Sequence, residues 1–599
     1  MKIESQKLNI TETFRNYYYT VPDYQREYIW EQSNVNLLLA DIYDEFISDP
    51  NSEYFIGSVV VNRLGDGNYE VIDGQQRLTT LFLGLCVFKK FFKEMPDYLN
   101  SVQSLLLSGG TVNERGEIIN KSHLILQYED STDLLDKIVE EKDIRITMNG
   151  SSAKIKNAYD EIRNFLNTNF TDKKEIAKFY GYYTNKVNFI QIETPNINDA
   201  LKTFETINER GIGLNPMDLL KNLIFRQLDR DKFKEINLEW KKMSELLSKN
   251  KQKSLRFLRY FIMSNYKVKD TKDTEVVRED EIYTWISRHD EQCNYSSDPF
   301  GFVKKLIENT EAYVNFQKGL NIDNTSNNYL NNIRKLGGGS FSQHLVLLLS
   351  AKDLNKELFT YLVRQIETLV FYYTITKTPA KKLEVKFSKW ANELRLIVLS
   401  ADNKDEALND FINDKFQNEI KGMSNDYKIN FENLNINSLQ NYKIKYTFAK
   451  IAQYIDSKRL GQKEPGSLDN YLEKEKEIEH ILPNNPEKDL IAEIGDQEEY
   501  DELKIKFGNL TLLEKPINIV AGRNFFSDKK ELYKDSNIYL TKSIVRKEEI
   551  GKDTSITRIN KKLLSFDKWD KESIKKRQEM LYKLSMDIWK VESFKNLNL

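Results

Sequence analysis

In the stretch EIEHILPNNP, residues 477–486, His480 directly follows Glu479. Two apolar residues and a proline come next. The chain is sparing with imidazole, since it holds only four histidines in 599 residues. The residues before His480 favour a strand that ends in a turn, which would leave the ring at the edge of that strand. Because the ordinary pKa of histidine is about 6.5, this ring is a candidate for proton transfer near neutral pH.

Two further segments follow the histidine at a spacing that suits one site. The run FGNLTLLEKPIN predicts a second short strand from Asn509 to near Asn518, and GRNFFSDKKELY predicts the start of a helix. An acid–histidine pair on the first strand and asparagines after it allow one divalent ion to meet a phosphodiester. This layout predicts a nuclease.

The expected roles follow from the chemistry of phosphodiester hydrolysis. His480 would act as general base, and Asn509 would orient the imidazole through a hydrogen bond. Glu479 and the amide oxygen of Asn518 would bind Mg²⁺ or Mn²⁺, and Lys529 would contact a phosphate oxygen. The competing interpretation is that His480 lines a small apolar core and the asparagines are turn residues. The ordered set favours the nuclease.

A second candidate site lies in the first third of the chain. The runs at residues 54–62 and 69–73 predict a hairpin, and a helix is expected after Gly74 in VIDGQQRLTT. Gly74 allows close backbone approach, and the free N–H groups of the following helix favour an anion. The planar guanidinium of Arg77 suits phosphate, and Asp73 could bind magnesium or a ribose hydroxyl. Taken alone, Asp-Gly after a strand is usually only a turn.

The pattern of the whole chain predicts an α+β protein of several domains. A strand at residues 187–194 and a helix opened by Pro216 complete an α/β unit over residues 1–225. Residues 226–430 show long helical patterns, which predict a connecting domain, and residues 431–599 form the third domain with the expected nuclease site. A closing amphipathic helix is expected from about Asp570 to Ile588.

Composition limits the partners and the compartment. The net charge of -2 gives no global attraction for nucleic acid or a membrane, so any polyanion site must be local. Two cysteines fit a reducing compartment, and the apolar runs are too short to span a bilayer, so a cytoplasmic location is expected. No phosphate-binding loop of the G-x-x-x-x-G-K-[ST] kind occurs, so a phosphate site would have another design.

Both sets of motifs resemble the GmrSD-type type IV restriction enzymes. IEHILP, FGNLTLL, PIN and NFF are similar to the C-terminal HNH (ββα-metal) endonuclease domain of that family. VPDYQREYIW, YFIGSVVV, VIDGQQRLTTL and FETINERGIGLNPMDLLKN are similar to its N-terminal domain, whose core is ParB nuclease-like. The resemblance implies a nucleoside triphosphate site, with GTP, ATP, CTP and UTP left open, made by Tyr24, Gln25, Arg26, Asp73, Gly74, Gln75, Gln76, Arg77, Asn208, Gly211, Asp218 and Lys221.

The function expected from this resemblance is a modification-dependent DNA endonuclease of antiphage defence that is regulated by nucleotide. Its partners would be DNA, above all modified phage DNA, a nucleotide, and a second copy in a possible homodimer. Two other functions stay open: a nucleotide-switched DNA-binding protein with an inactive HNH domain, and an RNA-cleaving nuclease of abortive infection. Equivalent active-site chemistry serves DNA and RNA, so the sequence leaves these alternatives undecided.

Overall fold

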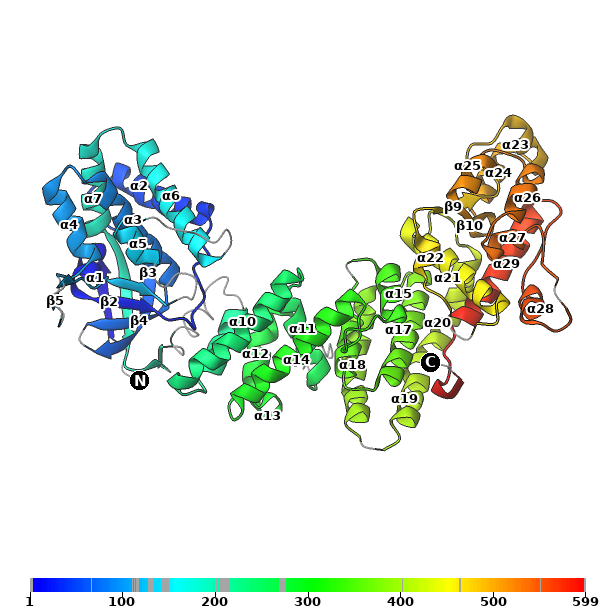
Figure 1. The fold of residues 1–599 in the computed structure, drawn as a ribbon, viewed down its shortest axis with the longest axis horizontal. Helices are drawn as coiled ribbons and strands as arrows, with labels where there is room; N and C mark the ends of the chain where they lie inside the picture. The colour runs from blue at the N-terminus through cyan, green and yellow to red at the C-terminus, as the bar shows by residue number, and fades with distance from the viewer. Residues whose placement is uncertain are drawn as a thin grey trace. The chain divides into compact units, whose positions relative to one another are not determined.

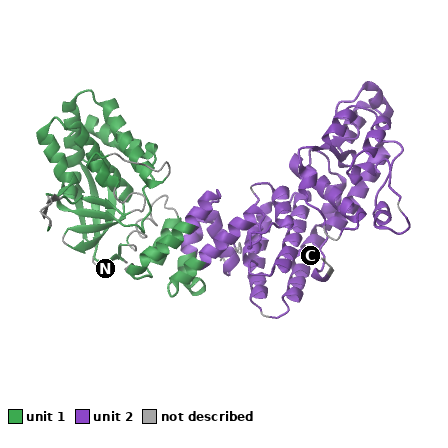
Figure 2. Ribbon diagram, in the orientation of Figure 1, with its two compact units in different colours: residues 1–242, 286–304 green, residues 243–285, 305–599 purple. Residues whose placement is uncertain are grey.

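The chain separates into two compact units in a computed structural model (Figure 2). The first unit comprises residues 1–242 and 286–304, and the second comprises residues 243–285 and 305–599. The structure describes all residues except 1–3, 66, 110, 113, 115–117, 128–133, 143–149, 198, 201–202, 204–215, 269–275, 340, 401, 463–464, 550 and 597–599. Within the described part of the chain, no helix combines the length and the hydropathy that crossing a membrane requires.

A six-stranded mixed sheet forms the centre of the first unit. Its strands, in spatial order, are β1 (Glu4–Asn9), β8 (Val187–Thr194), β3 (Tyr54–Gly65), β4 (Asn68–Asp73), β2 (Tyr18–Val21) and β7 (Leu124–Leu126). The pairs β1–β8 and β3–β4 are antiparallel, whereas β8–β3, β4–β2 and β2–β7 are parallel. The predicted hairpin and the predicted strand at residues 187–194 are therefore confirmed. Two short strands, β5 (Thr111–Val112) and β6 (Ile118–Ile119), pair separately.

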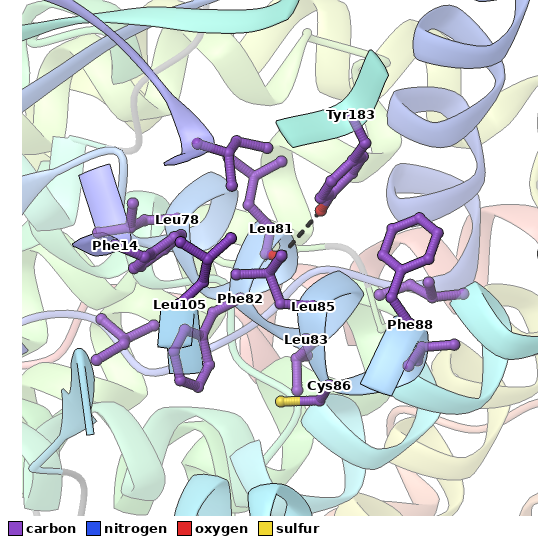
Figure 3. Packing of buried hydrophobic residues seen from close by; sticks show 14 of the residues in the cluster. Phe14, Leu78, Leu81, Phe82, Leu83, Leu85, Cys86, Phe88, Leu105 and Tyr183 are labelled. Atoms are coloured by element: carbon purple, nitrogen blue, oxygen red, sulfur yellow. Dashed lines mark hydrogen bonds between the residues drawn. The ribbon is translucent and has the colours of Figure 1, made fainter. Parts of the chain in front are cut away.

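The helix α3 (Gln75–Phe91) follows β4 directly and lies inside the apolar core of this unit. Figure 3 shows its leucines and phenylalanines among those of neighbouring elements. The hydroxyl of Tyr183, from α7 (Lys173–Lys186), donates to the Leu81 carbonyl at 2.9 Å. A side chain at Gly84 would meet that hydroxyl at 2.3 Å, so the close approach requires glycine here. This packing fixes the N-terminal end of α3, where the second candidate site was predicted.

Other helices surround α3 and the sheet in the first unit (Figure 1). They are α1 (Ile10–Asn16), α2 (Gln32–Ser48), α4 (Pro96–Leu106), α5 (Leu134–Val139) and α6 (Ser151–Asn169), together with α7. The first unit also contains α9 (Pro216–Phe225) and α13 (Asp290–Cys293). The predicted helix start at Pro216 is confirmed. The predicted helix after residue 194 lies mostly outside the described residues, as do the two predicted nucleotide contacts Asn208 and Gly211.

Long helices make up most of residues 226–430, as predicted. Three of them, α10 (Phe233–Lys249), α12 (Ile282–Arg288) and α14 (Pro299–Lys318), contribute residues to both units. The others belong to the second unit: α11 (Ser254–Asn265), α15 (Asn328–Gly337), α16 (Leu345–Ser350), α17 (Lys356–Ile375), α18 (Ala380–Leu399), α19 (Lys404–Ile412) and α20 (Asn418–Glu432).

The C-terminal part of the second unit is built around one antiparallel strand pair. The strands β9 (Lys476–His480) and β10 (Leu510–Glu514) pair with His480 opposite Leu510. Helices pack around them: α21 (Asn441–Arg459), α22 (Asp469–Leu472), α23 (Lys488–Ile494), α24 (Gln497–Lys504), α25 (Lys515–Ala521), α26 (Phe526–Lys534), α27 (Tyr539–Lys542), α28 (Ser555–Asn560) and α29 (Lys571–Ile588). The closing helix is confirmed, with the Asp570 side chain accepting from the backbone N–H of Ser573.

The second strand of this pair is shorter than predicted. It ends at Glu514, and the chain turns at once into α25, which carries Pro516 in its first turn. Proline cannot donate to a strand ladder but suits the start of a helix, which explains the difference. Asn509 therefore precedes the strand in a short 3₁₀ turn, and Asn518 lies on a helix. The structure confirms a mixed α+β fold, while its likeness to ParB and HNH folds stays a prediction.

Candidate functional site

His480 is the last residue of β9, and its ring is held from one side by the backbone. Its Nδ1 atom lies 3.3 Å from the carbonyl oxygen of Lys504, which can only accept, so Nδ1 carries the hydrogen. The other ring nitrogen, Nε2, lies 3.2 Å from the amide nitrogen of Asn484, an exposed side chain that water could replace. Burial lowers the pKa of His480, against the opposing effect of the Lys504 carbonyl. The neutral ring therefore presents a basic nitrogen toward the surface.

Asn509 supports this arrangement without touching the imidazole. Its buried side chain accepts from the Leu482 N–H at 2.7 Å and from the indole N–H of Trp569 at 3.0 Å. Its amide nitrogen donates to the carbonyls of Leu482 at 3.0 Å and Lys504 at 2.9 Å. The predicted hydrogen bond from Asn509 to the ring is thus not formed. Instead, Asn509 fixes the carbonyl of Lys504, which in turn holds His480.

Glu479 and Lys529 pair with each other in the interior of the second unit. The Lys529 ammonium donates to Glu479 Oε1 at 2.7 Å and to the carbonyls of His480 and Ile481 at 2.8 and 3.2 Å. The hydroxyl of Tyr533 donates to the same carboxylate oxygen at 2.8 Å. Both charged side chains are buried, Lys529 completely. In this arrangement the two side chains are paired with each other, so the expected metal contact of Glu479 and phosphate contact of Lys529 are not formed and stay predictions.

Asn518 meets a carboxylate that the sequence reasoning did not select. Its amide nitrogen donates to Glu477 Oε2 at 3.1 Å, and the Lys515 ammonium lies 3.0 Å from Glu477 Oε1. These contacts, the one with Lys515 first, lower the pKa of Glu477. Glu477 and Asn518 are both partly exposed, so oxygen atoms remain near the surface. The two-residue spacing from Glu479 was the available signal, since residues i and i+2 share one face of a strand.

The same alternation separates the predicted residues into two groups. Glu477 and Glu479 leave one face of β9, whereas His480 leaves the other. The structure brings His480 together with Lys504 and Asn484, and Asn518 together with Glu477. Within the described part of the chain, no group of three or more His, Cys, Asp or Glu side chains forms a metal cluster. A cation here would need to complete its coordination with water or phosphate.

In the first unit, the predicted nucleotide residues surround a pocket of about 190 Å³. The pocket lies between the β4–α3 junction, the segment after β2, and α9. Its lining includes all the predicted residues that the structure describes, namely Tyr24, Gln25, Arg26, Asp73, Gly74, Gln75, Gln76, Arg77, Asp218 and Lys221, together with Trp30, Ile72 and Asn222. The sequence reasoning missed these last three, which have no spacing that distinguishes them.

The pocket floor is the left-handed turn between β4 and α3. Gly74 has φ +85°, and a side chain there would meet Val59 Cγ2 at 2.8 Å and the Ser58 carbonyl oxygen at 3.2 Å. Only glycine fits this position without strain. The guanidinium of Arg77 donates to the Ile56 carbonyl at 2.8 Å and lies 3.9 Å from Asp73. The turn therefore brings the N-terminal end of α3 to the pocket, where backbone N–H groups favour an anion.

Charged side chains of both signs meet in this pocket. Arg26 lies 3.0 Å from Asp218, and the Lys221 ammonium donates to Asn237 at 2.7 Å. Burial raises the pKa values of Asp73 and Asp218, against the effect of the neighbouring arginines. Burial lowers the pKa of Lys221 to about 8, although Asp218 opposes that shift. A desolvated group of cations and acids of this kind is typical of a functional site.

The glutamines of the motif divide between structural and ligand-facing atoms. Gln76 is satisfied at both ends, since its amide oxygen accepts from the Ile29 N–H at 2.8 Å and its nitrogen donates to the Glu27 carbonyl at 3.0 Å. In contrast, Gln25 Nε2 and Gln75 Oε1 are buried pocket atoms without a hydrogen-bond partner among the described residues. Buried polar atoms are normally paired, so these two atoms are candidates for contact with a ligand.

Comparison with known proteins identifies two family models in this chain. The model described as "GmrSD restriction endonuclease, N-terminal domain" matches residues 9–225, which include the pocket residues of the first unit. The model described as "GmrSD restriction endonucleases, C-terminal domain" matches residues 423–584, which include β9, β10 and the residues around His480. No curated protein matches the chain. The N-terminal and C-terminal matches occur in that order along one chain, which therefore belongs to the GmrSD restriction endonuclease family.

Proposed function

We propose that this type IV restriction nuclease cuts DNA phosphodiester bonds at the β9–β10 site, with His480 as the general base. The observation that carries the proposal is the anchored ring: Nδ1 faces the Lys504 carbonyl, and Nε2 faces an exposed amide. A neutral imidazole with one nitrogen fixed as donor can take a proton from water through the other. The lowered pKa of His480 keeps this neutral form dominant near pH 7.

Three restraints hold the base in position. The Lys504 carbonyl fixes the ring, and Asn509 fixes that carbonyl from below. Lys529 holds the carbonyls of His480 and Ile481, and thereby the end of β9. A general base must lie within hydrogen-bond reach of the proton that it removes, so a rigid strand end serves the reaction. We assign Asn509 and Lys529 as positioning residues on this basis.

A divalent cation, Mg²⁺ or Mn²⁺, would supply charge stabilisation of the phosphate and its leaving oxygen. Oxygen donors suit such an ion, and Asn518 and Glu477 supply them near the surface. The carboxylate of Glu479 would join them only if Lys529 and Tyr533 released it. The oxygen donors therefore fit a hard cation. Asn518 would bind it whether the carboxylate comes from Glu477 alone or from Glu479 as well.

The pocket of the first unit is proposed to bind a nucleoside triphosphate that regulates cutting. Its volume of about 190 Å³ is smaller than the roughly 300 to 1,000 Å³ of sites that enclose a drug-sized ligand. It therefore accommodates part of a nucleotide, such as the phosphate chain. Arg26, Arg77 and Lys221 supply positive charge, and Gln25 Nε2 supplies an unused donor. Sensing of a DNA modification, as in antiphage defence, is proposed for the same unit on the basis of family membership.

A substrate panel tests this function against its two alternatives. Modified phage DNA, unmodified duplex DNA and RNA are incubated with the full chain and Mg²⁺, with and without each triphosphate. We expect cutting of modified DNA and a change in rate with one or more triphosphates. Cutting of RNA alone would identify an RNA-cleaving nuclease instead. Binding of DNA without cutting by the wild-type chain would identify a nucleotide-switched DNA-binding protein.

A further inference from the structure

A second and larger pocket, of about 490 Å³, lies in the second unit, and none of the residues around His480 lines it. It is bordered by α15, α17, α21 and the segment that follows α29. Both α17 and α21 are long helices that are buried over most of their length. The inward face of such a helix is ordinarily apolar. At this pocket, however, the two helices present polar side chains, including Arg364, Glu367, Thr368, Lys450, Gln453 and Ser457.

Two cations of the pocket wall keep hydrogen-bond donors that the described residues do not use. The ammonium of Lys450, a residue only 9% exposed, contacts Glu367 Oε1 at 2.9 Å. The guanidinium of Arg364 donates to Glu592 at 2.5 Å. An ammonium has three donors and a guanidinium five, so most of their capacity is free within the described part of the chain. Both cations lie over the ring of Tyr329, at 5.6 and 5.9 Å from its centroid, and so share one wall.

Two acidic residues of the pocket, Glu367 and Glu592, already have cationic partners. Glu367 accepts from the hydroxyl of Tyr446 at 2.5 Å, from the Asn332 amide at 3.2 Å and from Lys450. Glu592 is paired with Lys590 at 2.8 Å as well as with Arg364. Because Glu367 and Glu592 already have these partners, they do not use all the donors of Arg364 and Lys450. The remaining donors at this wall favour an anion, although Glu357 and Asp587 also line the pocket.

Two buried hydroxyls complete the pattern. Thr368 and Ser457 line the pocket and are 3% and 6% exposed. Ser and Thr hydroxyls both donate and accept hydrogen bonds, so these two side chains can serve a bound molecule in either role. Their position on facing helices gives a ligand contacts on both sides.

We propose that this pocket binds a phosphate-bearing small molecule no larger than a mononucleotide. Its phosphate would meet Arg364 and Lys450, and its hydroxyl or amide groups would meet Thr368 and Ser457. The volume falls within the roughly 300 to 1,000 Å³ of ordinary ligand sites. Free phosphate, a sugar phosphate and a nucleoside monophosphate share this chemistry and differ in how much of the pocket they fill.

The ligand would act on the nuclease site through α21. This helix lines the pocket and also packs against β10, the strand paired with β9. The pocket also joins α15 and α17, which lie outside both family matches, to α21, which lies within the C-terminal match. A bound molecule that orders these helices would change the stability of α21 and of the β9–β10 pair that carries His480. The pocket is therefore an effector site for cutting.

The test is a calorimetric titration of the full chain with inorganic phosphate, ribose 5-phosphate and adenosine monophosphate, each alone. We expect at least one probe to bind, and to bind roughly tenfold more weakly to Arg364→Gln, a loss of about 1.4 kcal/mol. This variant leaves Glu592 paired with Lys590, so folding is retained. Arg288→Gln, which changes an exposed arginine on α12, serves as the matched control and should bind as the wild type does.

Two further variants locate the binding. Ser457→Leu fills the pocket and should abolish binding; if its melting temperature falls, Ser457→Ala removes the hydroxyl alone and should still weaken binding. Gln25→Ala alters the pocket of the first unit and should leave this binding unchanged. The proposal is overturned if no probe binds the folded wild-type chain. It is equally overturned if binding survives in Arg364→Gln and Ser457→Leu but is lost in Gln25→Ala.

Discussion

The two predicted sites use their motif residues in different ways. At the end of β9, Glu479, Asn509 and Lys529 are buried and hold one another or the backbone, so one imidazole is left to face the surface. In the first unit, by contrast, the motif residues line a pocket and leave buried polar atoms without partners. A motif thus contains residues that hold the site in place as well as residues that can contact a ligand. The hydrogen bonds of each side chain, rather than its place in the motif, decide which role it has.

The largest expected effect tests the proposed general base of the first site. His480→Ala removes the proposed base, so cutting of DNA should fall roughly 10²- to 10⁴-fold, as measured by plasmid nicking. Triphosphate binding by the first unit and the melting temperature should stay unchanged, since the ring makes only one contact with the backbone.

His289→Ala is the matched control, because that residue lies in the first unit, outside the pocket described there. It should cut as the wild type does. Equal cutting by wild type and His480→Ala would remove the basis of the nuclease assignment.

The second prediction tests whether Lys529 stabilises the fold or contacts phosphate. Lys529→Met leaves the buried carboxylate of Glu479 without its cation, so the free energy of unfolding should fall by about 3–5 kcal/mol. Denaturant unfolding of the variant measures this loss. The double variant Lys529→Met with Glu479→Leu should regain much of it, because both charges are then absent. If Lys529 instead contacted phosphate, the single variant would keep its stability and lose DNA affinity.

Local elements of both sites could be predicted from the sequence, but the direction of their side chains could not. Alternating and helical patterns located β3, β4 and α3, and Pro216 marked the start of α9. These signals act within a few residues. The Glu479–Lys529 pair joins positions fifty residues apart, and nothing in the spacing shows that the lysine ends in the core. The exception is strand alternation, which implies that the adjacent residues Glu479 and His480 leave opposite faces of the strand.

The third prediction compares two glutamines of the first-unit pocket. Gln25→Ala removes a pocket atom without a partner, so triphosphate binding should weaken roughly tenfold at nearly unchanged stability. Gln76→Ala removes two hydrogen bonds to the segment after β2, so it should lower the melting temperature first. Calorimetric titration and thermal unfolding of both variants test the division. The same loss of stability in both would show that Gln25 is also structural.

The smallest expected effect concerns pH at Lys221. Burial holds the pKa of this ammonium at about 8, below its ordinary value, so the charge is present at pH 7 and lost as the pH rises through 8. Affinity for a triphosphate should therefore decrease a few-fold between pH 7 and 9, as measured by titration at constant ionic strength. The effect on stability runs in the opposite direction to the effect on affinity. Because the unfolded chain keeps this proton up to a higher pH than the folded chain, the free energy of unfolding should increase as the pH rises above 8.

Lys221→Arg should remove this pH dependence, because a guanidinium stays charged throughout the range. A decline of equal size in the wild type and in Lys221→Arg would assign the pH effect to another group of the pocket. A flat profile in the wild type would show that the ammonium does not contact the phosphate chain. Either result would leave Arg26 and Arg77 as the cations of this pocket that recognise the nucleotide, since both lie at its edge beside an acid.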